Sequence, residues 1–260
     1  MIEVRSLFEN KVCIITGAAN GIGKAIAKSF HKEGASIAFI DKDKDNGYVL
    51  LDEIDDEKSR HYFYHGNVGK EEDLRDFTDV VIKRYGKVDY LVNNACYSNK
   101  GLLSGCTFEE FNEVLRVGVT APYYLAMLLK DHFHEGASIV NISSTRANMS
   151  QKDTESYSAA KGGISSLTHA MAMSLSGTAR VNSISPGWID TTNAENFSES
   201  DRLQHPSQRV GIPEDIARVV LFLCDQKSDF INGENITVDG GMSKKMIYDG
   251  DENWHYAEDK

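Results

Sequence analysis

The sequence predicts an α/β fold, a doubly wound parallel sheet with helices on both faces. Short apolar runs alternate with longer amphipathic segments along the chain, as in repeated strand–helix units. The apolar runs are continuous and do not alternate with polar residues, which is typical of strands buried on both faces. With 260 residues, 41% of them hydrophobic, the chain is long enough to build this sheet as one large domain.

The elements can be placed from local signals. Strands are expected at residues 11–16, 36–40, 61–64, 88–92, 138–142, 180–184 and 235–238. Helices are expected at residues 24–33, 43–57, 71–85, 108–134, 155–175 and 213–223. Gly34 ends the first helix, Thr107 is an N-cap for the helix 108–134, and Pro213 suits a first helical turn.

One long segment has no pattern of regular structure. Residues 192–208 are polar and irregular, and a loop of this length in a compact domain is usually functional. We expect a lid over the site, and the alternative is a disordered insert.

The composition excludes several classes of function. A formal net charge of −11 disfavours nucleic-acid binding, which needs clustered Lys and Arg. The four cysteines, Cys13, Cys96, Cys106 and Cys224, lack metal-binding spacing, so we predict no metal site. No apolar run approaches the roughly 18 residues of a membrane span. We see no signal peptide, so a reducing cytoplasm is the expected location.

A glycine-rich turn lies between the first strand and the first helix. Gly17, Gly21 and Gly23 allow a tight turn and a close approach to a pyrophosphate at the helix N-terminus. Asp41 ends the second strand, where a carboxylate can bind an adenosine ribose and repel a 2′-phosphate. Asn20, and no basic residue, precedes Gly21 in the turn. These features favour NAD over NADP.

A second group of polar residues follows the fifth strand. Ser143 and Ser144 end the apolar run, and Tyr157 and Lys161 share one face of the next helix. An ammonium beside a phenol favours the phenolate, which can exchange a proton with an alcohol or carbonyl oxygen. A serine hydroxyl aimed at the same oxygen would stabilise its developing charge. The alternative is a tyrosine and a lysine on a solvated helix face.

Taken together and in order, these motifs resemble the classical short-chain dehydrogenase/reductase family. The match spans about residues 8–243 and also includes Asn93-Asn94-Ala95, Pro186-Gly187 and Asp239-Gly240-Gly241. The resemblance implies a single Rossmann-like domain over residues 1–243, with the 192–208 lid inside it, and a homotetramer or homodimer. Residues 244–260 extend beyond it as an acidic tail, for which Trp254 and Tyr256 leave docking on a neighbouring subunit as an alternative.

The resemblance also implies roles for individual residues. Tyr157 is the general acid/base, Lys161 assists it and holds the nicotinamide ribose, and Ser144 polarises the substrate oxygen. The cofactor would contact Gly17, Asn20, Gly21, Ile22, Gly23, Asp41, Asn67, Val68, Asn94, Ala95, Tyr157, Lys161, Pro186, Gly187, Ile189 and Thr191.

Two residues depart from the family pattern. Cys96 replaces a glycine after Asn-Asn-Ala, and Gly118 replaces an asparagine that helps to hold a proton-relay water. The relay either survives through backbone and water or is weakened, and glycine tolerates a local helix distortion.

The leading hypothesis is an NAD-dependent oxidoreductase acting on the alcohol or carbonyl group of a polar small molecule, such as a sugar, polyol or oxo-acid derivative. Arg146 would bind an anionic substrate or pair with a nearby acid, and Trp188 would form a pocket wall or pack against the lid. Gly118 motivates an alternative, a catalytically weak NAD(H)-binding sensor or subunit.

Overall fold

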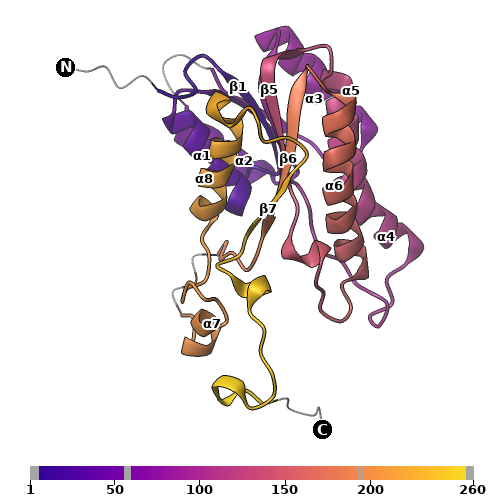
Figure 1. Ribbon diagram of the computed structural model, residues 1–260. Coiled ribbons are helices and arrows are strands. Elements are labelled where there is room, and N and C mark those ends of the chain that lie inside the picture. Colours follow the sequence, from indigo (N-terminus) through magenta and orange to yellow (C-terminus); the bar gives the residue numbers. More distant parts are fainter. Residues whose placement is uncertain (1–5, 56–59, 193, 195, 256–260) are drawn as a thin grey trace, which may run out of the picture.

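A computed structural model describes residues 6–55, 60–192, 194 and 196–255 (Figure 1). Seven strands form one sheet in the order β3-β2-β1-β4-β5-β6-β7, and every neighbouring pair is parallel. The strands are β1 (Val12–Thr16), β2 (Ser36–Asp41), β3 (Tyr62–His65), β4 (Val88–Asn93), β5 (Phe133–Ile142), β6 (Ala179–Pro186) and β7 (Asn235–Val238). The predicted doubly wound parallel fold is therefore confirmed.

Helices cover both faces of this sheet. They are α1 (Gly21–Lys32), α2 (Lys44–Ile54), α3 (Glu71–Tyr85), α4 (Phe108–Leu115), α5 (Ala121–Leu129), α6 (Glu155–Ser174), α7 (Glu199–Leu203) and α8 (Pro213–Cys224). Figure 1 shows α1, α2 and α8 on one side and α3, α4, α5 and α6 on the other. The end of the helix predicted over residues 43–57 lies outside the described residues.

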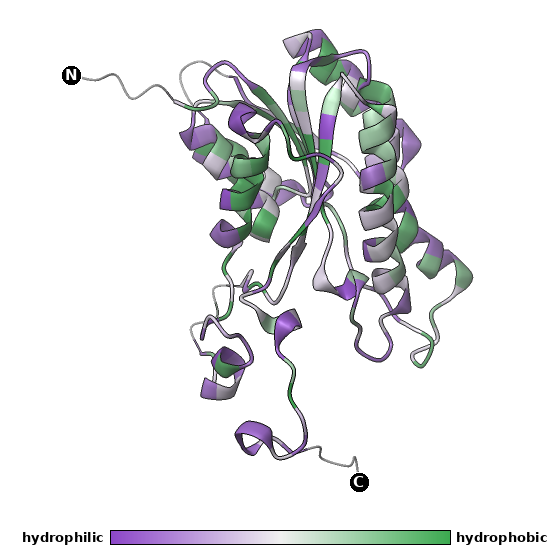
Figure 2. Cartoon of the chain, in the orientation of Figure 1, coloured by the Kyte–Doolittle hydropathy of each residue, from purple (hydrophilic) through white to green (hydrophobic). Residues whose placement is uncertain are grey.

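Each face of the sheet has its own apolar core. Phe30 of α1 and Val220 of α8 pack on one face, and Phe77 of α3 and Leu125 of α5 pack on the other. In Figure 2 the hydrophobic colour concentrates on the strands and on the helix faces turned toward them. These cores bury the strands on both sides, as the unbroken apolar runs predict. No helix of the described residues is long and apolar enough to cross a membrane.

The prediction of one helix over residues 108–134 is wrong in two respects. A π-helical turn, Arg116–Thr120, separates α4 from α5, and α5 ends at Leu129. Strand β5 then begins at Phe133, earlier than the predicted residue 138, where Phe133 pairs with Val88. The N-cap prediction is confirmed, because Thr107 and Glu110 form a reciprocal capping box.

The segment 192–208 forms a loop with a fixed base. Ile189 and Gly211 form an isolated parallel bridge, in which Asp190 N donates to Gly211 O at 2.8 Å and Gly211 N donates to Trp188 O at 3.1 Å. We call this bridge the neck. The prediction that the segment has no regular structure is wrong in part, because it contains α7, whose N-cap Ser198 accepts from Asp201 N.

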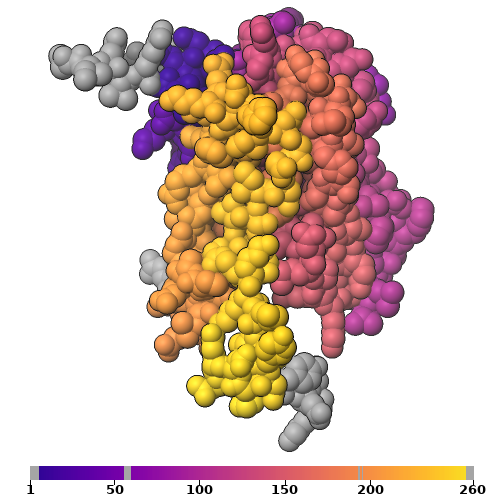
Figure 3. All heavy atoms as spheres, in the orientation of Figure 1, coloured from indigo at the N-terminus to yellow at the C-terminus, as the bar shows by residue number. Residues whose placement is uncertain are grey.

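The segment 192–208, called the lid below after its predicted role, follows β6, so it lies at the carboxyl end of the sheet. Near its end, Ser207 N donates to Gly240 O at 3.0 Å, so the lid rests on the turn that follows β7. Figure 3 shows the segment after β7 (yellow) at the same end of the molecule as the lid (orange). This end of the sheet is where ligands bind in open α/β folds.

Candidate active site

A cavity of about 530 Å³ opens at the carboxyl ends of the strands. Every predicted site residue except Gly23 lines it. The cavity reaches from the ends of β2 and β3 to α6, and its lining includes Gly17, Asn20, Gly21, Ile22, Asp41, Asn67, Val68, Asn94, Ala95, Ser144, Tyr157, Lys161, Pro186, Gly187, Ile189 and Thr191. The fold therefore brings residues from seven separate chain segments into one site.

Gly23 lies behind the cavity wall. A β-carbon at this position would lie 2.1 Å from Gly17 O and 2.6 Å from Asn94 Nδ2. Both distances are far shorter than any real contact, so only glycine lets the first turn of α1 pack against the glycine turn. The residue shapes the cavity without lining it.

The glycine turn is held in place by the end of β4. Asn94 Nδ2 donates to Thr16 O at 3.0 Å and to Gly17 O at 2.7 Å. The Thr16 hydroxyl accepts from the backbone N–H groups of Asn94 and Ala95, both at 3.0 Å. Asn94 thus lines the cavity and also fixes the turn that begins at Gly17.

Asp41 ends β2 and faces the glycine turn. Its carboxylate accepts from Ala19 N and from Asp43 N, both at 2.9 Å. Asp43 in turn accepts from Asn20 Nδ2 at 2.9 Å. The hydrogen bonds from Asn46 and Asn20 lower the pKa of Asp43 below its usual value. Two carboxylates therefore flank the turn at this end of the cavity.

The two neighbouring serines have different surroundings. The Ser143 hydroxyl donates to Lys161 O at 2.8 Å and lies 2.8 Å from the Ser165 hydroxyl, so its bonds connect β5 to α6. The Ser144 hydroxyl accepts from Arg146 N at 3.1 Å. This leaves the Ser144 proton without an acceptor among the described residues, so Ser144 can donate to a ligand.

Tyr157 and Lys161 lie one turn apart on α6. Lys161 is 4% exposed, and its ammonium donates to Ile142 O at 2.8 Å. It lies 5.4 Å from the centre of the Tyr157 ring. Residues 142–144 and α6 thus bring a hydroxyl, a phenol and an ammonium to one end of the cavity.

Gly118 and Cys96 lie close together behind this group. Gly118 is buried in the π-helical turn, and a β-carbon there would lie 3.0 Å from Ala160 Cβ and 3.5 Å from Cys96 Sγ. Cys96 itself lines the cavity. The π-helical turn is a local helix distortion of the kind that a glycine tolerates, and Gly118 lies within it.

Arg146 and Trp188 each have defined neighbours in the structure. Arg146 hydrogen-bonds to Gln151, so its described partner is an amide and not an acid. Trp188 contacts Phe197 edge-on, with ring centres 5.5 Å apart, and lies 6.2 Å from the His205 ring. Trp188 therefore packs against the lid.

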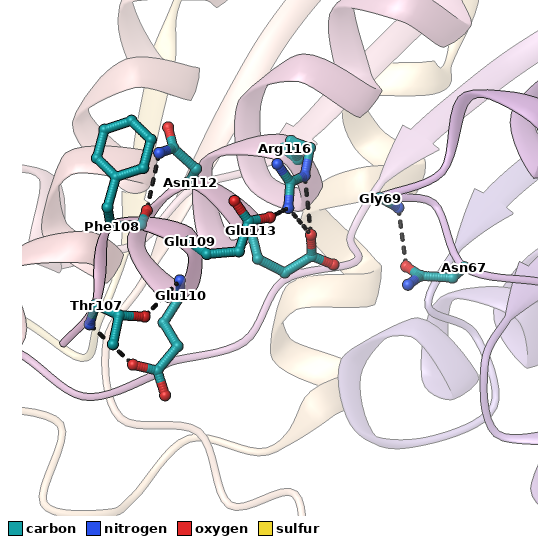
Figure 4. Close-up of polar contacts among 9 residues, drawn as sticks. All are labelled: Asn67, Gly69, Thr107, Phe108, Glu109, Glu110, Asn112, Glu113 and Arg116. Carbon is teal, nitrogen blue, oxygen red and sulfur yellow. Dashed lines mark hydrogen bonds and ion pairs between the residues drawn. The ribbon is translucent and has the colours of Figure 1, made fainter.

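Lys42, Glu113 and Val117 are among the lining residues that the predicted site did not include. Figure 4 shows Glu113 of α4 beside the Asn67–Gly69 turn, paired with Arg116, which also bonds to Glu109. The spacing of Glu113 and Val117 places both on one helix face, a signal that pointed to packing rather than to a site. Lys42 lies between Asp41 and Asp43, and these two acids offset its positive charge in the sequence, so it was not predicted to contribute to the site.

A doubly wound parallel sheet, with a glycine turn after β1 and polar groups converging at the strand ends, is typical of dinucleotide-binding oxidoreductases. Residues 17–243 match a family model described as enoyl-(acyl carrier protein) reductase. The chain belongs to the short-chain dehydrogenase/reductase family, whose members use nicotinamide cofactors.

Several relatives match along nearly their whole length. The chain is 39% identical to an uncharacterized oxidoreductase of Thermotoga maritima, covering 94% of this chain and all of the relative. It is 33% identical to a 3-oxoacyl-[acyl-carrier-protein] reductase of the same organism, over 90% of this chain and 98% of that one. It is also 33% identical to the L-fucose dehydrogenase of Mus musculus, over 90% of this chain and 89% of that one.

Solved structures show the same fold. An apo SCOR enzyme from Clostridium thermocellum is 44% identical, with a TM-score of 0.88 over 96% of this chain and all of that one. A glucose/ribitol dehydrogenase from Brucella melitensis is 29% identical, with a TM-score of 0.84 over 92% and 99%. A short-chain dehydrogenase from Burkholderia cenocepacia in complex with NADP is 27% identical, with a TM-score of 0.84 over 91% and 99%.

Proposed function

We propose that this protein transfers a hydride between NAD(H) and the alcohol or carbonyl group of a polar small molecule, such as a sugar, polyol or oxo-acid derivative. The observation that carries the proposal is the single cavity shared by the glycine turn, Asp41 and the Ser144–Tyr157–Lys161 group. When bound, the dinucleotide donates or accepts the hydride. The protein supplies its orientation and the proton.

The cavity suits a dinucleotide at its glycine-turn end. The first turn of α1 has no acidic residue. Asn20 is the N-cap residue, but its side chain makes no hydrogen bond to the helix and instead donates to Asp43. The helix N-terminus therefore keeps N–H groups for a pyrophosphate. Asp41 would accept from the adenosine ribose, and Asn67 and Val68 would face the adenine.

At the other end, each polar group has a distinct task. Tyr157 would give a proton to the substrate oxygen during reduction and take one during oxidation. The Lys161 ammonium would stabilise the phenolate and hold the nicotinamide ribose. Ser144 would donate to the substrate oxygen as charge develops on it. Pro186, Gly187, Ile189 and Thr191 would frame the nicotinamide.

The preference for NAD rests on Asp41 and Asp43. A carboxylate that accepts from ribose hydroxyls repels a 2′-phosphate, and a second carboxylate nearby adds to the repulsion. The Burkholderia cenocepacia structure contains NADP, so this fold also accommodates the phosphorylated dinucleotide. Direct binding measurements with NAD and NADP would separate the two.

The polar substrate class is supported by the names of two relatives, an L-fucose dehydrogenase and a glucose/ribitol dehydrogenase. A panel would test it: sugars and polyols with NAD, oxo-acids and diketones with NADH, and a 3-oxoacyl thioester as the competing class. Turnover confined to the thioester would reject a polar substrate.

Gly118 favours one alternative, a catalytically weak NAD(H)-binding sensor or subunit, because it offers no side chain to hold a relay water. Tight dinucleotide binding with no turnover on any member of the panel would support that alternative.

We also infer the wider organisation of the protein. Residues 1–243 would form one oxidoreductase domain that assembles into a homotetramer or homodimer in the cytoplasm, and residues 244–260 would form an acidic tail. Light scattering on the full chain and on a chain ending at residue 243 would test both the assembly and the independence of the tail.

A further inference from the structure

Lys42 and Tyr97 meet across the cavity. Lys42 follows β2, Tyr97 follows β4, and β1 lies between these strands in the sheet. The Lys42 ammonium nevertheless lies 5.1 Å from the centre of the Tyr97 ring, and both residues line the cavity. The contact therefore bridges the crevice at the end of β1, where the glycine turn begins.

Tyr97 is suited to hold a cation through its ring face. The side chain is half-buried, and this burial raises the pKa of its hydroxyl, with a further contribution from Glu113. The ring is thus a neutral phenol at neutral pH. The face of such a ring attracts an ammonium ion modestly at an exposed position.

The contact with Tyr97 determines where the Lys42 ammonium lies relative to the proposed ribose site at Asp41. Lys42 is the next residue after Asp41, and its stem is long and flexible. An ammonium released from Tyr97 could reach the ribose hydroxyls beside Asp41, offset the carboxylate charge and pair with a 2′-phosphate. Asp43 already accepts from Asn20 and Asn46.

We propose that Tyr97 is a specificity-determining residue for the cofactor: by holding Lys42 across the crevice, it keeps that ammonium from a 2′-phosphate and leaves Asp41 to exclude NADP. The inference rests on the proposed function, because it requires a dinucleotide whose adenosine ribose lies at Asp41. It assigns cofactor choice partly to a residue 56 positions beyond Asp41 in the chain.

The test is direct binding to the full chain, with no substrate needed. Dissociation constants for NAD⁺ and NADP⁺ are measured by calorimetry for the wild type, Tyr97→Ala, Tyr97→Phe, Lys42→Gln and the double variant Tyr97→Ala/Lys42→Gln. Tyr97→Ala should improve NADP⁺ binding relative to NAD⁺ about tenfold, the effect of one hydrogen bond to a charged group. Tyr97→Phe should keep the wild-type ratio because it retains the ring face.

The double variant decides the mechanism. Replacing Lys42 in the Tyr97→Ala background should cancel the gain for NADP⁺, and added salt should reduce the gain in the single variant. An unchanged ratio in Tyr97→Ala, or a gain that survives Lys42→Gln, overturns the proposal. Tyr97→Leu provides the same comparison if the alanine variant is unstable.

The result also separates this inference from the proposed function. A wild type that binds NADP⁺ better than NAD⁺ contradicts the NAD preference, yet the change of ratio in Tyr97→Ala still decides the role of Tyr97. A wild type that binds neither dinucleotide overturns both.

Discussion

Gly118 and Ala160 meet where neither helix has room for another carbon. A β-carbon on Gly118 would lie 3.0 Å from Ala160 Cβ, whereas its 3.5 Å separation from Cys96 Sγ would be an ordinary contact. Ala160 directly precedes Lys161 on α6. The π-helical turn is therefore packed tightly against the helix that carries the Tyr157–Lys161 pair.

We predict that Gly118→Asn lowers both stability and turnover. Overpacking of this kind costs about 1–3 kcal/mol, and the displaced α6 would shift Lys161. Urea unfolding and steady-state kinetics provide the measurements. In the Gly118→Asn background, a second substitution Ala160→Gly should restore more stability and turnover than Cys96→Gly does, because Ala160 makes the closer contact. Higher turnover at unchanged stability would instead show that the missing asparagine limits proton transfer.

Tyr157→Phe should reduce turnover by about 10²–10⁴-fold, the usual contribution of general acid–base catalysis. The ring is retained, so the dissociation constant for the dinucleotide should change little. Kinetics on the best substrate of the panel, with calorimetry for the cofactor, measure the two effects. Near-normal turnover in this variant would exclude Tyr157 as the proton donor.

Asp41→Ala should weaken NAD binding about tenfold and affect NADP binding less. The variant would lose a hydrogen bond from the ribose hydroxyl of NAD, but it would also lose the repulsion between the carboxylate and the 2′-phosphate of NADP. The comparison uses the ratio of the two dissociation constants. Asp52→Ala, on the exposed surface of α2, is a matched control. An equal loss for both cofactors would place the ribose elsewhere.

The ion pairs of Asp215 should make stability fall in acid. Its hydrogen bond from Arg209, with further bonds from Ile212 N and Arg218, holds the pKa of Asp215 well below its usual value. A depressed pKa contributes stability that is present above the unfolded value, about 4, and is lost as pH falls below it.

Asp215→Asn tests this dependence. The variant should lose about 1–3 kcal/mol at pH 7 and show a smaller decline in stability between pH 5 and pH 3 than the wild type. Urea unfolding across this range provides the measurement, and Asp52→Asn is the control. Parallel pH profiles for the wild type and Asp215→Asn would contradict the assignment.

The structural features predicted correctly from the sequence are those that depend only on neighbouring residues. Thr107 as an N-cap and the strand at 235–238 depend on nearby residues alone, and both are confirmed. The candidate site followed from motifs at strand ends, because the topology brings those ends together.

The features that escaped prediction depend on distant packing. The π-helical turn forms where Gly118 meets Ala160, a contact that no local pattern encodes. The contact between Lys42 and Tyr97 joins residues that are separated in the chain by two helices and two strands, α2, β3, α3 and β4. The helix α7 is short and has no buried side chain, so its sequence carries no periodic apolar signal.

The neck between Ile189 and Gly211 has a consequence for how this scaffold can change over time. Because the bridge closes the lid at its base, insertions or replacements within residues 192–208 leave the two ends of the loop where they are. The Tyr157–Lys161 pair on α6 and the turn at Gly17 lie outside that closed loop. We therefore predict that grafting the corresponding segment of a relative between residues 191 and 209 would change the substrate range and leave these groups in place.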